Sequence, residues 1–149
     1  MNGLKFRYRP VDEVIHEMEN CGECSISISD ADFFGTPEPP KEVMRALKGR
    51  GIQWQAGVTS KLAQDDGMLE LAAESGCTML SIGFESISRA TLESVHKHVN
   101  RPETFAPLAE KVHSYGIMVF GLFMFGFDGD DSSVFDETVN FNINAKYDA

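Results

Sequence analysis

Four stretches of the chain carry the apolar pattern of buried strands. They cover residues 24–29, 52–58, 77–87 and 117–125. In the third stretch, CTMLSIGFESI, a period of two places Leu80, Ile82 and Phe84 on one face. The opposite face is small and polar and ends in Glu85. The pattern predicts a strand with one face under helices and a carboxylate at its carboxyl end, where ligands bind in α/β sheets.

Segments with helical spacing of apolar residues separate these strands. They cover residues 10–20, 39–49, 66–75, 88–100, 104–116 and 131–145. The stretch 117–125, IMVFGLFMF, is almost continuously apolar, which predicts a strand covered on both faces. Regular alternation of strands and helices predicts a parallel sheet with right-handed crossovers. No linker divides the chain, so we expect one domain over residues 1–149.

A polar strand face recurs along the chain. The first strand alternates serines, the second carries Gln53 and Gln55, and the third carries Ser81 and Glu85. A sheet that curls around a polar lumen needs this pattern, whereas a flat sheet with helices on both sides is usually apolar on both faces. The sequence favours an α/β fold of parallel βα repeats, a partial TIM-like barrel segment of about four strands. A doubly wound open parallel sheet is the alternative.

Composition and charge narrow the class of protein. The chain has 149 residues and a formal net charge of -10, from 23 acidic against 13 basic residues. Such a surface does not favour nucleic acid or an anionic membrane. No apolar run approaches the roughly 20 residues of a membrane span, and the N-terminus lacks the apolar segment of a signal peptide. An odd number of cysteines, 3, favours a reducing, cytoplasmic location over a disulfide framework.

Four pieces of the sequence resemble one family. They are RYRPVDEVIHEME, ISISDADFFG, LAAESGCTMLSIGFESIS and GIMVFGLFMFGFDGDD, and they occur in the order and spacing of the radical S-adenosylmethionine (SAM) enzymes. The likeness is to the branch that is often fused to a cobalamin-binding domain. It implies a parent iron–sulfur enzyme that reductively cleaves SAM to methionine and a 5′-deoxyadenosyl radical. Methyl transfer or rearrangement of a small-molecule substrate would follow, with cobalamin as an additional cofactor in that branch.

The family's defining Cys-x-x-x-Cys-x-x-Cys loop, which holds a [4Fe–4S] cluster, does not occur in the sequence. Cys21 and Cys24 have a Cys-x-x-Cys spacing without a third cysteine, and Cys77 begins a strand at the end opposite to Glu85. We therefore expect a radical SAM core segment truncated at both ends, without metal ligands and inactive by itself. Its missing partners would be an N-terminal cluster segment and a cobalamin-binding domain. Unpaired edge strands also predict a homo-oligomer.

The resemblance also assigns site residues for SAM. It places the amino group of SAM near Asp30, Asp32 and Phe33, after the first strand of this chain. Carboxylates suit an ammonium group because they form charge-assisted hydrogen bonds with it. Asp30-Ala31-Asp32 departs from the adjacent acids that are usual in the family. An Asx turn or a helix N-cap is the alternative role for these acids.

The remaining assignments lie at the ends of the third and fourth strands. By resemblance, Glu85 accepts hydrogen bonds from the ribose hydroxyls, with Ser86 beside it. Phe125 and Gly126 would flank the adenine, because glycine permits a close approach of the backbone. The alternatives are a solvent-exposed acid at a strand end for Glu85 and an ordinary turn for Gly126.

Two other classes of function stay open at this point. One is a complete, non-radical binding or receiver-like signalling domain, with a magnesium pocket formed by Asp30 and Asp32. Its weakness is that no lysine ends the last strand, where the chain reads Phe125-Gly126-Phe127. The other is a βα-barrel enzyme of a different class, which a convergent acid–base pair would favour.

Overall fold

The four expected strands form one sheet. The computed structural model describes residues 8–22, 25–36 and 38–148. The strands are β1 (Ser25–Ile28), β2 (Gln53–Thr59), β3 (Cys77–Glu85) and β4 (Met118–Phe123). All neighbouring strands are parallel, and their order in the sheet is β1-β2-β3-β4. Each strand is therefore added beside its predecessor in the sequence.

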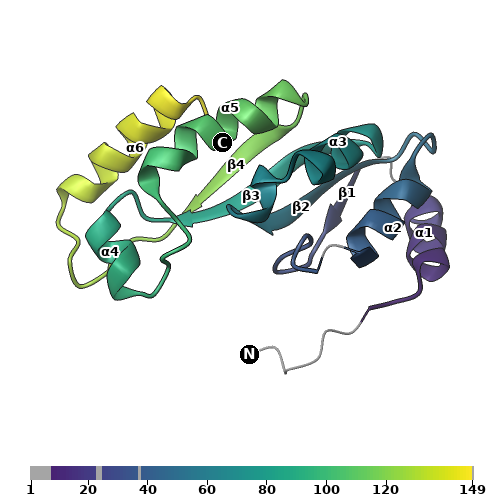
Figure 1. Cartoon of the computed structure of the whole chain (residues 1–149), viewed down its shortest axis with the longest axis horizontal. Helices are drawn as coiled ribbons and strands as arrows, with labels where there is room; N and C mark the ends of the chain where they lie inside the picture. The colour runs from purple at the N-terminus through teal and green to yellow at the C-terminus, as the bar shows by residue number, and fades with distance from the viewer. Residues whose placement is uncertain (1–7, 23–24, 37, 149) are drawn as a thin grey trace.

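Helices cover one side of this sheet. The described helices are α1 (Val11–Asn20), α2 (Glu38–Leu47), α3 (Asp66–Glu74), α4 (Arg89–Ser94), α5 (Phe105–Ser114) and α6 (Ser133–Ala145), with the short 3₁₀ helices η1 (Leu62–Gln64) and η2 (Pro102–Thr104). Figure 1 shows α3, α5 and α6 along the same side of the sheet. Parallel crossovers are right-handed, so a consecutive strand order keeps their helices on one face. The prediction of a partial βα-barrel segment is confirmed, and the doubly wound alternative is not what the chain forms.

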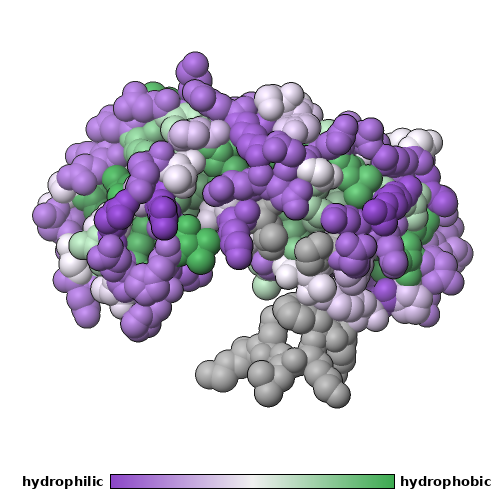
Figure 2. Space-filling view, in the orientation of Figure 1, coloured by the Kyte–Doolittle hydropathy of each residue, from purple (hydrophilic) through white to green (hydrophobic). Residues whose placement is uncertain are grey.

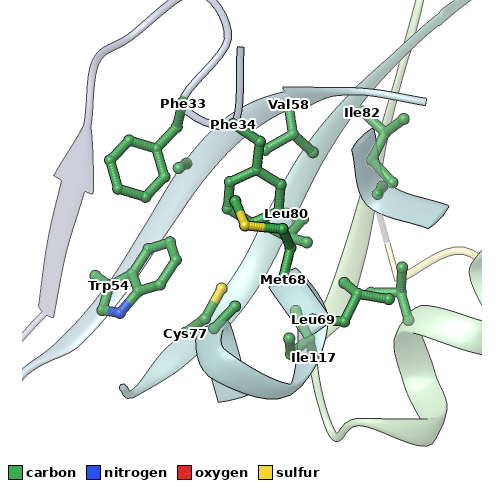
Figure 3. Packing of buried hydrophobic residues seen from close by; sticks show 14 of the residues in the cluster. Phe33, Phe34, Trp54, Val58, Met68, Leu69, Cys77, Leu80, Ile82 and Ile117 are labelled. Carbon is green, nitrogen blue, oxygen red and sulfur yellow. The ribbon is translucent and has the colours of Figure 1, made fainter. Parts of the chain in front are cut away.

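The core lies between this side of the sheet and the helices. Leu80, Ile82 and Phe84 of β3 are fully buried there, as the two-residue period predicts. Trp54 of β2 is also fully buried, and its Nε1–H donates to the Ser75 carbonyl at 3.1 Å. Figure 3 shows Trp54, Leu80 and Ile82 of the strands together with Met68 and Leu69 of α3. The indole satisfies its one donor inside the core, so its burial leaves no polar group unpaired.

A glycine fixes the connection between α3 and β3. Gly76 has a φ of 96°, and a Cβ built there would lie 2.2 Å from the Ile52 carbonyl oxygen. Trp54 N–H donates to the Gly76 carbonyl at 3.0 Å, so the turn is tied to β2. Only glycine combines this φ with so close an approach of two backbones.

The other side of the sheet, here called the open face, carries Gln55, Ser81, Gly83 and Leu122, and none of the helices in the described part of the chain covers it. The prediction that residues 117–125 are covered on both faces is wrong, because Leu122 is 45% exposed on this face. The strand is apolar throughout, yet all crossover helices lie on the opposite side. In Figure 2 the outline is hollowed at the lower middle, between the parts that contain α4 and α2.

No helix in the described part of the chain is long and apolar enough to cross a membrane. The longest of them, α6, ends at Ala145 and is followed by Lys146, which has a left-handed φ of 55°. Residues 147 and 148 then return to β4. The Tyr147 ring stacks on the Phe84 ring, with centroids 5.1 Å apart, and lies over Gly121, where a Cβ would approach it to 2.9 Å.

Candidate functional site

Glu85 ends β3 in a strained turn at the carboxyl end of the sheet. Its φ is 70°, and Ser86 N–H donates to the Phe84 carbonyl at 2.9 Å. Glu85 is thus the central residue of a γ-turn with positive φ, a rare form that costs a non-glycine residue about 1–3 kcal/mol. The register between β3 and β4 shifts at the same place, between Gly83 and Glu85.

The Glu85 carboxylate lies over the open face. A Cβ added to Gly83, which would point to that face, would lie 3.3 Å from Glu85 Oε1. Lys97 Nζ donates to the same oxygen at 3.1 Å. The side chains of Glu85 and Lys97 are 18% and 53% exposed, so the lysine reaches the carboxylate from solvent. Such a half-exposed ion pair stabilises the fold by only about 0–1 kcal/mol, and a ligand can replace it at little cost.

The end of α4 places Lys97. His96 has a left-handed φ of 58°, and its N–H donates to the Glu93 carbonyl at 3.1 Å. Lys97 N–H donates to the Leu92 carbonyl at 2.8 Å. These two bonds form a Schellman motif, which ends the helix and turns the chain toward β3. The helix predicted over 88–100 therefore stops at Ser94.

Asn100 follows and joins the ends of two strands. Its Nδ2 donates to the Gly83 and Phe84 carbonyls at 3.0 and 2.9 Å, and its Oδ1 accepts from Ser60 Oγ at 2.6 Å. Ser60, just beyond β2, is 2% exposed. Sequence reasoning missed this residue because an asparagine in an Asn-Arg-Pro loop is typical of a plain turn.

The acids after β1 lie at the same end of the sheet. Asp32 Oδ1 accepts from Thr59 N–H at 3.3 Å, which ties the loop to the last residue of β2. Burial raises the pKa of Asp32, although hydrogen bonds from the Thr59 and Phe34 backbone oppose the shift. Asp30 is exposed. The structure thus brings Asp32 toward the sheet and leaves Asp30 in solvent.

Phe33 and Ser86 take part in the fold as well as in the expected site. The Phe33 ring is 9% exposed and packs edge-on against Trp54, with centroids 5.4 Å apart. Its N–H donates to the Gly57 carbonyl at 2.8 Å, which ties the loop after β1 to β2. Ser86 is 4% exposed, and its Oγ accepts from Ser88 N–H at 3.0 Å. Ser86 therefore stabilises the turn that carries Glu85.

Phe125 and Gly126 lie beyond β4, which ends two residues earlier than expected. Phe125 is 45% exposed and contacts Phe135 of α6, with ring centroids 4.9 Å apart. Gly126 has a φ of 92°, and its N–H donates to Asp130 Oδ2 at 2.9 Å. Phe127 N–H donates to the same oxygen at 3.0 Å. This loop presents an exposed aromatic ring beside a glycine with a left-handed φ.

The cysteines do not suit an iron–sulfur cluster. Burial raises the pKa of the Cys77 thiol to about 12, and Cys77 lies at the opposite end of β3 from Glu85. Cys21 is exposed at the end of α1, where its Sγ donates to the Met18 carbonyl at 3.2 Å. Cys24 lies outside the described residues. A cluster ligand must be a thiolate, which burial disfavours at Cys77, and Cys21 lies at the end of α1 in no group of described residues that could hold a metal, so the described cysteines do not fit this cofactor.

Among the described residues, no group of three or more His, Cys, Asp or Glu side chains is arranged to hold a metal ion. Asp130 instead accepts from backbone N–H groups, and Asp131 accepts from Ser133 N–H at 2.7 Å near the start of α6. Hydrogen bonds from Ser133 lower the pKa of Asp131. Nothing in the described geometry supports a receiver-like magnesium pocket at Asp30 and Asp32.

These features define a class: a one-sided segment of a βα barrel, with a carboxylate held over the open face at the carboxyl end. A sequence model described as the radical SAM superfamily matches residues 2–141 of the chain. The match spans nearly the whole sequence. The chain belongs to the radical SAM superfamily.

Curated relatives are methyltransferases. The chain is 33% identical over 145 residues to bacteriochlorophyllide d C-12(1)-methyltransferase of Chlorobaculum tepidum, across 93% of this chain and 32% of that protein. It is 29% identical over 130 residues to cytidylyl-2-hydroxyethylphosphonate methyltransferase of Streptomyces wedmorensis, across 83% of this chain and 24% of that protein. The chain thus spans a third or less of the length of each of these relatives.

A solved structure shares the fold. The radical S-adenosylmethionine methyltransferase TsrM of Kitasatospora setae, described with cobalamin and a [4Fe–4S] cluster bound, matches with a TM-score of 0.77. The sequence identity is 18%, and the match covers 93% of this chain and 29% of that protein. At this identity the likeness shows the fold of the segment and not its ligands.

Proposed function

We propose that this chain, over residues 1–149, is the SAM-binding βα segment of a radical SAM methyltransferase that acts on a small-molecule substrate. The observation that carries the proposal is Glu85, whose carboxylate lies over the open face at the end of β3 in a strained turn. Backbone strain of this kind persists where the surrounding structure holds it, and it clusters at ligand sites. The names of the curated relatives support methyl transfer.

Glu85 would bind the ribose of SAM. A carboxylate accepts from two hydroxyl groups at once, and each such bond is charge-assisted. The group is 18% exposed and contacts Lys97 from the solvent side, so it is accessible yet partly shielded from water. Partial shielding strengthens hydrogen bonds to a ligand.

The other site residues would hold the two ends of the cofactor. Asp32 and Asp30 would attract the amino group, and Asp32 gains most from a cation because burial already disfavours its charge. Phe125 and the backbone of Gly126 would border the adenine. Bound SAM supplies such enzymes with a methyl group or, after reductive cleavage, a radical, and the protein's part is to bind, orient and shield it.

A [4Fe–4S] cluster and cobalamin are suggested for the whole enzyme by the family and by the solved relative, and not by residues of this chain. The described cysteines do not fit a cluster, so the residues of this chain account for binding of SAM and not for its cleavage. We expect the chain by itself to bind SAM and to leave it uncleaved.

Calorimetric titration of the chain with SAM tests the proposal. We expect Glu85→Gln to weaken binding about tenfold or more, because the ribose hydroxyls lose a charged acceptor. Glu103→Gln is the matched control, since Glu103 is an exposed acid that pairs with Arg89. Equal affinities of the wild-type chain and the Glu85→Gln variant, or no binding by the wild-type chain, would contradict the assignment.

A further inference from the structure

The orientation of the Asn100 amide is fixed by its partners. The Gly83 and Phe84 carbonyls can only accept hydrogen bonds, so the group that contacts both must be the NH₂ of Asn100. The remaining oxygen then accepts from the Ser60 hydroxyl at 2.6 Å. Both amide hydrogens and the amide oxygen are thereby used. The side chain works as a bridge between the ends of β2 and β3.

Asn100 binds the carbonyls of the two peptide units that precede Glu85. One unit joins Gly83 to Phe84, and the other joins Phe84 to Glu85 and begins the strained turn. The Phe84 carbonyl accepts from the Asn100 amide and also from Ser86 N–H. The second bond closes the turn around Glu85, which lies between Phe84 and Ser86. The register shift against β4 falls between Gly83 and Glu85, and pairing resumes at Glu85, whose carbonyl accepts from Met124 N–H at 2.8 Å. Asn100 therefore restrains the peptide units from which the Glu85 side chain projects.

The same loop brings Lys97 to the carboxylate. Asn100 N–H donates to the Lys97 carbonyl at 3.0 Å, so the two residues belong to one turn. The Schellman motif fixes the start of the turn, and the Asn100 bridge fixes its end on the sheet. Loss of the bridge would release both the peptide units before Glu85 and the turn that carries its ion-pair partner.

We infer that Asn100 is a positioning residue for Glu85, which holds the carboxylate in the direction needed to bind the two hydroxyls of a ribose. The ribose as ligand rests on the proposed function above. The bridge itself rests on contacts within the chain. The two parts can therefore fail separately.

The experiment compares adenosine with 2′,3′-dideoxyadenosine, which lacks both hydroxyls, by titration of the 149-residue chain. We expect the wild-type chain to prefer adenosine by about 10- to 100-fold, the range for hydrogen bonds to a charged acceptor. Asn100→Ala should abolish this preference and leave the affinity for dideoxyadenosine unchanged. A general loss of structure would instead lower both affinities together.

Three further variants sharpen the result. Asn100→Asp keeps an acceptor for Ser60 but turns an oxygen toward the two carbonyls, so it should behave like Asn100→Ala. Ser60→Ala keeps both donors and should lose only part of the preference, which keeps the test usable if an Asn100 variant does not fold. Asn140→Ala, an exposed asparagine of α6, is the control and should match the wild-type chain.

NMR of the Glu85 and Ser86 amide resonances in the same variants distinguishes failure of the ribose assignment from failure of the Asn100 bridge. If the wild-type chain shows no ribose preference, the proposed function is wrong, and displaced Glu85 resonances in Asn100→Ala would still support the bridge. If the wild-type chain and Asn100→Ala share the same preference and the same Glu85 resonances, Asn100 does not position Glu85 and the inference is overturned.

Discussion

Asp148 pairs with Val119 along the edge of β4 that faces away from β3. Val119 N–H donates to the Asp148 carboxylate at 2.8 Å, and Asp148 N–H donates back to the Val119 carbonyl at 3.1 Å. His113 Nε2 lies 2.8 Å from the same carboxylate oxygen. One residue thus satisfies a donor and an acceptor that an edge strand would otherwise leave to solvent.

This pairing predicts a pH-dependent contribution to stability. Burial raises the pKa of Asp148, but the hydrogen bonds from Val119 and His113 outweigh it and hold the pKa below its usual value. A carboxyl group with a lowered pKa stabilises the fold above its unfolded pKa, near 4, and the contribution is lost as the pH falls through the folded pKa. Asp148→Asn should therefore cost about 1 kcal/mol at pH 7 and less at pH 3, because the contribution declines as the pH falls below the unfolded pKa.

Urea unfolding at the two pH values measures this difference. Asp128→Asn is the matched control, because Asp128 is an exposed acid in the loop before α6. The control should unfold like the wild-type chain at both pH values. The same loss of stability in Asp148→Asn at pH 3 as at pH 7 would show that the charge is not responsible.

Gly76 predicts a severe defect on substitution. A methyl group there would lie 2.2 Å from the Ile52 carbonyl oxygen, and the φ of 96° is unfavourable for any other residue. We expect Gly76→Ala to destabilise the chain by about 3 kcal/mol or more or to prevent folding. Gly49→Ala is the control: its φ is 75°, but no atom lies within 4 Å of the new Cβ.

Thermal unfolding followed by circular dichroism compares the two glycine variants. The control carries only the left-handed backbone penalty of about 1–2 kcal/mol. Similar melting temperatures for Gly76→Ala and Gly49→Ala would mean that the α3–β3 turn can open without loss of the core.

Much of the fold was predictable from local pattern. The faces of β3 follow from its two-residue period, and the parallel order follows from βα alternation. The coverage of β4 was not predictable, because exposure of Leu122 depends on which face the helices take. Apolar composition alone cannot distinguish an open face from a buried one.

The candidate site was predictable only in part. Glu85 could be assigned because the two-residue period places it on the polar face of β3 and because it lies at the carboxyl end of that strand. Asn100 could not, since its partners Ser60 and Gly83 are 40 and 17 residues away in the chain and meet only in the folded sheet. The left-handed residue at the end of α4 is His96, without the glycine that usually signals this motif.

An exposed apolar stripe on α6 predicts self-association. Phe135, Val139 and Ile143 recur every four residues on α6 and are 55%, 56% and 69% exposed. Such a stripe beside an edge strand marks an interaction surface. We expect a dimer or larger oligomer at high concentration, which Val139→Glu should shift toward monomer because a charge cannot be buried unpaired.

Sedimentation velocity over a range of concentrations measures this association. Asn140→Glu is the control, since it adds the same charge to the neighbouring exposed position of α6. A wild-type chain that stays monomeric at the highest concentration would rule out the surface as a self-association site. Equal effects of the two variants would indicate net charge and not the stripe.

Asp32 predicts opposite effects on stability and on ligand binding. Burial raises its pKa, so the folded state binds its proton more tightly than the unfolded state does. The group therefore favours folding as the pH falls through the folded pKa, and its charge opposes folding at pH 7. Asp32→Asn removes that charge and keeps an oxygen that can accept from Thr59 N–H. The variant should unfold at a higher urea concentration than the wild-type chain at pH 7 and lose this advantage near pH 3.

The same variant should bind SAM more weakly, because the amino group loses a charged partner that is worth about tenfold in affinity. Asp12→Asn provides the comparison, since Asp12 is an exposed acid of α1 outside the proposed site. If Asp32→Asn is more stable than the wild-type chain but binds SAM more weakly, the Asp32 carboxylate serves ligand binding and lowers the stability of the fold. If that variant is less stable and binds SAM normally, Asp32 serves only to tie the loop after β1 to the end of β2.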